Sequence, residues 1–164
     1  MTASLRFSNL IENIPGMVFR AKHDKPRTLE FLSNASISLI GRKSKELLHE
    51  NFALQDLIHE EDIIDVSNRI DHGLESSQTY SVTYKLNEDL AVNKWVIESG
   101  NLVKDLTGDW YIEGSIFDIT DRVGLEEHIA ATTMETEDRE RTRISKEIHD
   151  GLQQTLGLSA MMFD

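Results

Sequence analysis

The chain contains no cysteine among its 164 residues. This absence excludes a disulfide framework, a thiol-based redox switch and the cysteinyl-flavin photochemistry used by one class of light sensor. Long apolar runs are missing as well, because no stretch approaches the roughly 18 apolar residues that a membrane-spanning helix needs. The N-terminus also lacks the basic region and apolar core of a secretory signal peptide. We therefore expect a cytoplasmic protein with no membrane span.

Basic residues are fewer than acidic residues in this chain. The sequence has 17 Lys and Arg against 29 Asp and Glu, a net charge of −12, and this balance opposes binding to the phosphates of nucleic acids. The basic residues near the C-terminus alternate with acidic ones instead of forming a patch, so we expect no nucleic-acid partner. The 39% of apolar residues suffices for the core of one ordinary domain with an additional helix appended to it.

Hydrophobic periodicity divides the chain into helices and strands. Ile63, Val66 and Ile70 recur at helical spacing, whereas Tyr80 and Val82 alternate with polar neighbours as in a strand. In chain order, the expected elements are a docking helix over 4–14, a hairpin of strands over 17–22 and 28–32, short helices over 35–40 and 44–48, a longer helix over 61–75, and strands over 79–86, 94–104 and 110–119. We expect the last three strands to be antiparallel.

The C-terminal part of the chain carries a His-Asp pair in a helical pattern. Apolar or small residues recur there at steps of three and four, the spacing of a helix face that packs in a bundle, and we name this set the seam: Ile144, Ile148, Leu152, Thr155, Leu158 and Met162. His149 flanks the seam, while Asp150 and Gln154, four residues apart, continue the polar face. A neutral imidazole in such an accessible place can act as a nucleophile at physiological pH.

Two other kinds of site do not fit this pattern. A helical zinc site needs a second ligand three or four residues from His149, where the sequence has Leu152 and Gln153. A relay of Ser145, His149 and Asp150 fails because neighbouring residues on a helix point about 100° apart. The alternative that remains is a solvated side chain, the usual role of a single helical histidine.

The 144–154 segment, ISKEIHDGLQQ, resembles the phosphoacceptor segment of bacterial sensor histidine kinases of the nitrate-sensor-like and DesK-like subfamily. The shared features are the His-Asp pair, the Gln five residues after the His and the flanking seam. The resemblance implies that His149 accepts the γ-phosphate of ATP and that Asp150 is a general base or orienter. It also implies that Gln154 positions water when the phosphoryl group is removed from a response regulator.

ATP and Mg²⁺ are expected to bind in a catalytic domain beyond this chain. The sequence stops at Asp164, before the second helix of the hairpin and before any Asn-rich or Gly-rich ATP-binding segment, so the fragment alone should be inactive. The alternative function is a non-catalytic ligand-binding and dimerisation module, in which His149 is an ordinary surface residue on a coiled coil.

Three shorter motifs resemble those of a PAS sensor domain, over roughly residues 5–122. They are the 40–48 segment IGRKSKELL, the 57–62 segment LIHEED and the 118–122 segment DITDR. The resemblance implies an α+β fold with a five-stranded antiparallel sheet and helices over one face. Glu60 replaces the usual proline of the middle motif, and we interpret His59 and Asp62 as the start of a helix rather than as ligands.

We therefore expect three parts: a PAS sensor domain with a docking helix over 1–122, a helical signalling linker over 123–142, and the start of the dimerisation and phosphotransfer helix over 143–164. The linker mixes acidic and basic residues with sparse apolar ones, which suits a coiled coil with a hinge at Gly124 and a homodimer joined along the helix. A disordered acidic linker is the alternative, but the good helix formers over 135–146 favour a helix.

The sequence does not specify the small-molecule ligand of the sensor domain. Apolar residues expected on its inner wall can either fill a core or line a ligand pocket: Phe19, Ile37, Ile40, Phe52, Ile64, Ile70, Trp95 and Ile97. Core packing is the simpler interpretation. Haem would need an axial histidine, and the candidate, His72, has the neighbours of a solvated helix end, so neither haem nor a metal site is expected.

Overall fold

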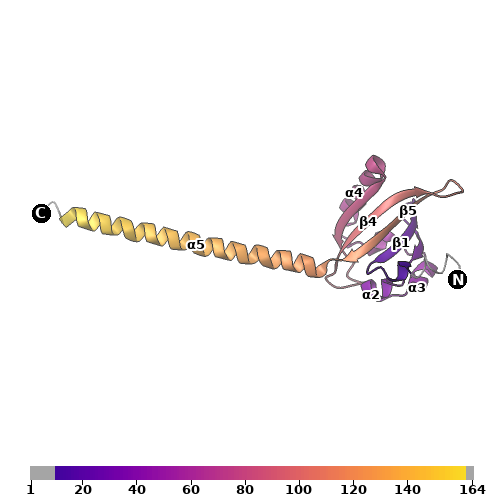
Figure 1. Ribbon diagram of the computed structural model, residues 1–164, viewed down its shortest axis with the longest axis horizontal. Helices are drawn as coiled ribbons and strands as arrows, with labels where there is room; N and C mark the ends of the chain where they lie inside the picture. The colour runs from indigo at the N-terminus through magenta and orange to yellow at the C-terminus, as the bar shows by residue number, and fades with distance from the viewer. Residues whose placement is uncertain (1–9, 162–164) are drawn as a thin grey trace. The chain divides into compact units, whose positions relative to one another are not determined.

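The computed structural model describes the backbone of residues 10–161 and the side chains of residues 10–147. The chain divides between Thr120 and Asp121 into two units. A sheet and its helices form the first unit, and the helix α5 (Thr120–Met161), apart from its first residue, belongs to the second (Figure 1). This division lies two residues before the expected end of the sensor domain at residue 122.

A five-stranded antiparallel sheet forms the framework of the first unit. Its strands are β1 (Met17–Lys22), β2 (Leu29–Leu32), β3 (Thr79–Lys85), β4 (Trp95–Lys104) and β5 (Trp110–Asp118), in the spatial order β2-β1-β5-β4-β3. The expected hairpin of β1 and β2 and the antiparallel pairing of β3, β4 and β5 are confirmed. Pairing of β5 with β1 places the last strand in the middle of the sheet. The expected α+β fold is thus confirmed.

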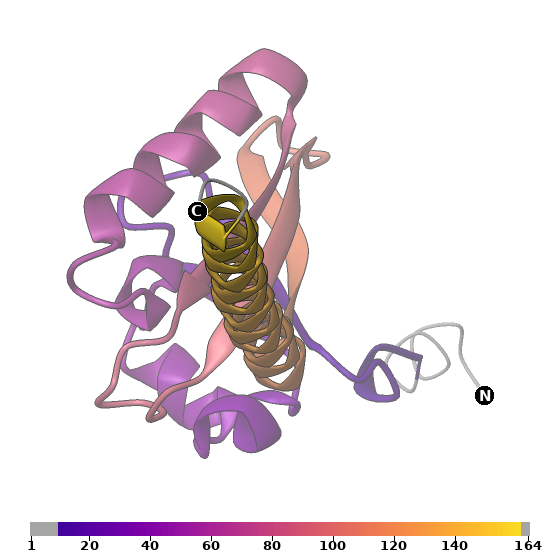
Figure 2. The same cartoon turned by 90° about the vertical axis from the view of Figure 1, so that its left-hand side faces the viewer.

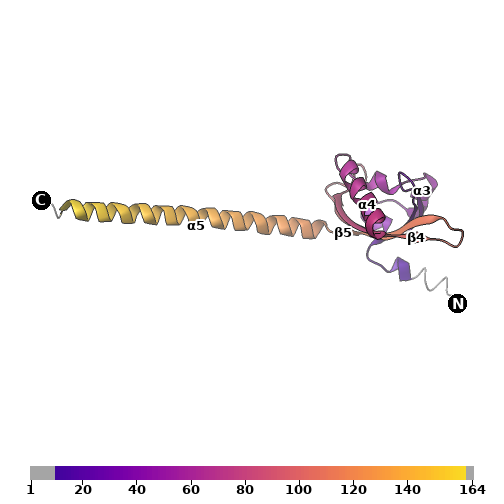
Figure 3. The same ribbon diagram turned by 90° about the horizontal axis from the view of Figure 1, so that it is seen from above.

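Burial alternates along the strands and distinguishes an inner from an outer face. In β3, Tyr80, Val82 and Tyr84 are buried, and the residues between them are exposed, because successive side chains of a strand point to opposite faces. Figures 2 and 3 show the helices on one side of the sheet and the N-terminal segment on the other. The core therefore lies between the inner face and the helices.

Three short helices and one longer helix cover the inner face. They are α2 (Ser36–Ile40), α3 (Ser44–His49), the 3₁₀-helix η1 (Leu54–Leu57) and α4 (Ile63–Ser77). In α4, Val66, Ile70 and Leu74 are buried at steps of four, the stripe that helical periodicity predicted. Burial of such side chains stabilises the fold by about 1.5–3 kcal/mol each. The 3₁₀-helix was not expected.

The N-terminal segment is only partly described. Residues 10–12 are helical, and the rest of the expected docking helix over 4–14 lies mostly outside the described residues. The chain then turns at Pro15 and Gly16 into β1. A Cβ atom on Gly16 would lie 2.6 Å from ring carbons of Phe117, so the close approach of the segment to β5 requires glycine at this position.

The 42 residues of α5 form one uninterrupted helix. The expected division between residues 142 and 143 and the expected hinge at Gly124 lie within this helix, and the linker region is helical rather than disordered. Side chains from 124 to 147 are exposed in the single chain. Among the described residues, no helix combines the length and the apolar character needed to span a lipid bilayer.

Candidate functional site

The candidate phosphoacceptor residues lie in the C-terminal part of α5. The backbone is helical at His149, Asp150 and Gln154, as the sequence pattern predicted. Their side chains lie outside the described residues, so the roles of the three residues stay predictions. Ile144, the member of the seam whose side chain is described, is 46% exposed. An apolar side chain in that state favours a partner helix.

Ion pairs between successive turns stabilise the helix just before His149. The guanidinium of Arg143 lies 2.6 Å from Glu140 and 3.3 Å from Glu147, three and four residues away. All three side chains are exposed, so each pair contributes only a few tenths of a kcal/mol. These pairs favour the helix without fixing a partner.

Hydrogen bonds around Thr120 define the start of α5. Asp118 Oδ1 accepts hydrogen bonds from the Thr120 backbone nitrogen (3.0 Å) and from its Oγ1 (2.6 Å). The backbone nitrogen of Trp95, the first residue of β4, donates to Thr120 Oγ1 at 3.0 Å. The first residue of α5 is therefore held to two neighbouring strands of the sheet.

Lys94 adds an ionic contact at the same place. Its Nζ lies 3.4 Å from Asp118 Oδ2 and donates to the carbonyl oxygens of Ser38 (3.2 Å) and Leu39 (2.9 Å) in α2. Burial acts to raise the pKa of Asp118, but the hydrogen bonds from Thr120 and the charge of Lys94 outweigh it and lower that pKa. Asp118 is thus held in its ionised form, which accepts these bonds best.

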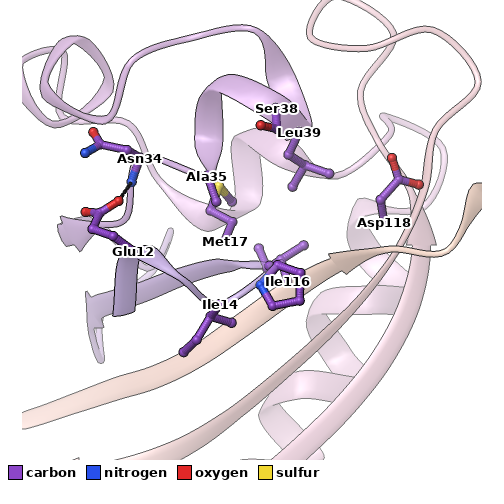
Figure 4. Close-up of a pocket in the computed structure, with 11 residues that line it drawn as sticks. Glu12, Ile14, Met17, Asn34, Ala35, Ser38, Leu39, Ile116 and Asp118 are labelled. Carbon is purple, nitrogen blue, oxygen red and sulfur yellow. Dashed lines mark hydrogen bonds between the residues drawn. The ribbon is translucent and has the colours of Figure 1, made fainter. Parts of the chain in front are cut away.

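A surface cavity of about 400 Å³ lies beside Asp118 (Figure 4). Met17, Leu39 and Ile116 form part of its apolar lining. At the other end of the cavity, Glu12 Oε2 accepts a hydrogen bond from the backbone nitrogen of Asn34 at 3.2 Å. The cavity therefore lies where the N-terminal segment, the region before α2 and the end of β5 meet.

A carboxyl group is buried in the first unit. Glu98 of β4 is 0% exposed, and its two oxygens accept hydrogen bonds from the hydroxyls of Tyr80 (2.5 Å) and Tyr84 (2.6 Å) in β3. Burial raises the pKa of Glu98 and outweighs the two hydroxyls and the charge of Arg27, which act in the opposite direction. Burial and the neighbouring carboxyl raise the pKa of both tyrosines, which keeps them protonated donors.

Gly100 makes room for this arrangement. Tyr80 is paired with Gly100 across the two strands, and a Cβ atom there would lie 2.7–2.8 Å from ring and hydroxyl atoms of Tyr80. The ring thus lies over Gly100, and its hydroxyl reaches Glu98 two residues away on the same face. Sequence analysis missed this cluster. Nothing in the local sequence indicates it, because the burial of Glu98 between partly exposed neighbours is seen only in the structure.

The expected inner wall of the sensor domain is only partly inside the fold. Phe19, Ile40 and Ile70 are buried in the packed core, and Phe52 packs against that core. These four residues therefore fill the core, the simpler of the two interpretations, and none of them lines the cavity beside Asp118.

The other four expected wall residues are not on the inner face, so this part of the expectation was wrong. Ile37 and Ile64 are 48% and 77% exposed on their helices. Trp95 and Ile97 are partly exposed and alternate with buried Val96, so they lie on the outer face. His72, the candidate axial ligand for haem, is exposed on α4.

Neither a family model nor a curated protein matches the sequence. Solved structures do match in fold. The PAS domain of a protein from Colwellia psychrerythraea covers 73% of this chain and 99% of its own length, with a TM-score of 0.62 and 10% identity. A sensory box histidine kinase/response regulator from Burkholderia thailandensis covers 80% and 98%, with a TM-score of 0.59 and 20% identity.

A PAS domain from a two-component sensor histidine kinase covers 71% of this chain and 99% of its own length, with a TM-score of 0.55 and 14% identity. At such low identities the likeness concerns the fold, and the matching feature is the antiparallel sheet in the order β2-β1-β5-β4-β3 with helices over its inner face. The chain therefore has the PAS fold.

Proposed function

We propose that this chain is the sensory and phosphoacceptor part of a two-component histidine kinase of the nitrate-sensor-like and DesK-like type. The observation that carries the proposal is the His149-Asp150 pair, with Gln154, on one uninterrupted helix that starts two residues after the last strand of a PAS fold. The likeness to PAS domains of sensor histidine kinases supports it.

In the proposed reaction, a lone pair of the His149 imidazole attacks the γ-phosphorus of ATP. The bond between that phosphorus and the bridging oxygen breaks, and ADP leaves. Asp150, the adjacent carboxylate, acts as general base or orienter, and its negative charge stabilises the positive charge that the ring acquires. ATP and Mg²⁺ are held by a catalytic domain elsewhere in the full-length protein, and the phosphoryl group passes on to an aspartate of a response regulator.

The PAS unit would regulate this reaction through the start of α5. Asp118, Thr120 and Lys94 connect that start to β4, β5 and α2, so a shift of the sheet on ligand binding changes the contacts of the helix's first residue. A homodimer joined along α5 would bring the two copies of His149 together. Ligand binding to the PAS unit then controls phosphorylation.

The first prediction concerns the phosphoacceptor. In the full-length protein, His149→Ala should abolish phosphorylation by γ-labelled ATP, because the imidazole is the group that attacks the γ-phosphorus. His128→Ala is the matched control, since His128 is an exposed histidine of the same helix. Phosphorylation that survives in His149→Ala would show that another residue is the phosphoacceptor, and a wild-type protein that is not phosphorylated would favour a non-catalytic PAS module.

The second prediction separates the two directions of phosphoryl transfer. Gln154→Ala should leave autophosphorylation largely intact and slow dephosphorylation of the response regulator by about tenfold or more, because only the hydrolytic step needs a positioned water. Gln153→Ala, which changes the neighbouring glutamine, should affect neither rate. Equal loss of both activities in Gln154→Ala would identify the residue as structural.

A further inference from the structure

The turn between β1 and β2 directs an arginine into the fold. Arg27 has a φ of 69°, in the left-handed region that residues other than glycine rarely adopt. Its backbone nitrogen donates to the Asp24 carbonyl at 3.0 Å, and its carbonyl accepts from the Leu54 nitrogen at 3.1 Å. The Arg27 side chain is only 4% exposed. The backbone is therefore held in an uncommon conformation that buries a charged group.

Only one nitrogen of the Arg27 guanidinium donates hydrogen bonds to described residues. Its Nη2 donates to Asp71 Oδ1 at 2.7 Å and to the Ser67 carbonyl at 3.4 Å, and its hydrogen bonds to described residues all leave from this one nitrogen. Nε and Nη1 keep donors available. Asp71 is fully engaged, because its Oδ2 lies 3.0 Å from Lys25 Nζ. Burial opposes ionisation of Asp71, but these two cations lower its pKa.

These three charged residues line a cavity of about 250 Å³ between the β1–β2 turn, η1 and the first half of α4. Ser67 belongs to the same lining, and its Oγ is buried and has no hydrogen-bond partner among the described residues. A buried hydroxyl without a partner is costly, and a ligand oxygen would satisfy it. The amides of Gln55 and Asn68 add further donors.

The charges of the cavity select the sign of its ligand. Lys25 and Arg27 contribute two positive charges and Asp71 one negative charge, so the lining carries one net positive charge in a chain whose total is −12. Both oxygens of Asp71 already accept from these cations, which leaves little to hold a ligand cation. The cavity therefore favours an anion with a single charge, which balances the net charge of the lining.

Apolar side chains complete the cavity. Ile63 and Ile64 line it, and Ile64 is 77% exposed. Hydrocarbon from a ligand would cover this side chain. A ligand with a charged end and a short apolar chain fits both parts of the lining.

We propose that this cavity binds a small organic monocarboxylate. Its oxygens accept hydrogen bonds from Ser67 Oγ and from Arg27, Lys25 closes over the carboxylate from the solvent side, and its hydrocarbon chain packs on Ile64. The proposal goes beyond the kinase function and does not depend on it, because binding is measured on the chain without ATP or a response regulator.

The test titrates sodium butyrate into the ¹⁵N-labelled chain and follows the amide resonances. We expect saturable shifts at Lys25, Ser67 and Asn68, and a dissociation constant raised about fivefold in Lys25→Gln through loss of one partly exposed charge contact. Ser67→Ala should weaken binding by a similar factor. Lys45→Gln removes an exposed lysine on α3 and should bind as the wild type does.

Two comparison compounds test the chemistry of the ligand. n-Butylamine has the same apolar chain with the opposite charge, and inorganic phosphate has acceptor oxygens without an apolar chain, so both should bind more weakly than butyrate. The proposal is overturned if either compound matches butyrate, if Lys25→Gln and Lys45→Gln weaken binding equally, or if butyrate leaves the three resonances unshifted.

Discussion

At the scale of single residues, Glu98 is the main exception to a packed apolar core. An unpaired carboxylate in that position would be very unfavourable, and two tyrosine hydroxyls reduce the cost by occupying both of its oxygens. Arg27 supplies a compensating positive charge. The group is therefore held by two hydrogen-bond donors of β3 and favoured in its ionised form by Arg27, but burial still determines the direction in which its pKa moves.

The third prediction follows from this raised pKa. As pH rises above about 4.5, the ordinary pKa of glutamate, the unfolded chain loses the proton before the folded chain does. The free energy of unfolding should therefore fall with pH until the folded-state pKa is passed. An amide in place of the carboxyl group has no proton to lose, so Glu98→Gln should gain stability relative to the wild type over that range and show a constant difference below it.

Urea unfolding of both proteins between pH 4 and 8 measures this difference in the free energy of unfolding. The difference grows with the separation between the folded-state and the unfolded-state pKa of Glu98. Glu60→Gln, at an exposed position, is the matched control and should show no such trend. Tyr84→Phe should destabilise the protein by about 1–3 kcal/mol, because one buried oxygen of Glu98 loses its donor. A difference between Glu98→Gln and wild type that is independent of pH would contradict the assignment.

At the scale of elements, periodicity predicted most strands and helices, but it did not predict how they are arranged. Alternation along a strand indicates its two faces but not which strands pair with it. The position of β5 between β1 and β4 therefore could not be predicted from periodicity. The 3₁₀-helix η1 has four residues, too few for a periodic signal. Local signals therefore identified the elements, while pairing between distant segments set the topology.

The faces of β4 illustrate a more specific limit. Its inner positions are Val96, Glu98 and Gly100, while Trp95 and Ile97 lie on the outer face. Hydrophobicity alone favours the opposite assignment, which is why the expected wall was wrong there. The Glu98 cluster could not be predicted either, since it depends on pairing with Tyr80 and Tyr84. The His149 segment, by contrast, is continuous in sequence and could be found without any tertiary contact.

The fourth prediction concerns α5 as an element. Met134 and Ile144 are 70% and 46% exposed in the single chain, which favours burial in a parallel homodimer. Ile144→Asp should shift the chain toward monomers, because burying such a side chain is worth about 1.5–3 kcal/mol in each helix. Ser145→Asp adds the same charge at the next position and should stay dimeric. Sedimentation equilibrium measures both, and a wild-type monomer at high concentration would refute the dimer.

At the scale of the whole molecule, the proposed function requires that a change in the PAS unit alters the environment of His149 through α5. Steps of three and four residues back from Ile144 pass through Arg141, Glu137, Met134 and Ala130 and reach Glu127. Leu125 and Ile129, four residues apart, lie about 180° and 140° around the helix from Met134. The helix thus offers two incomplete apolar stripes, which suits a coiled coil with two packing arrangements of similar energy.

The last prediction tests this two-state interpretation. Glu127→Leu with Glu137→Leu extends the stripe of Met134 and Ile144, and two buried leucines stabilise that arrangement by several kcal/mol, about the difference that moves a two-state equilibrium almost fully to one side. Phosphorylation of the full-length variant should therefore become independent of the signal to which the wild type responds. Glu126→Leu with Asp138→Leu makes the same chemical change at the adjacent positions and should keep the response. A response that also survives in the first variant would show that the linker is a passive tether, and that the PAS unit acts on His149 by another route.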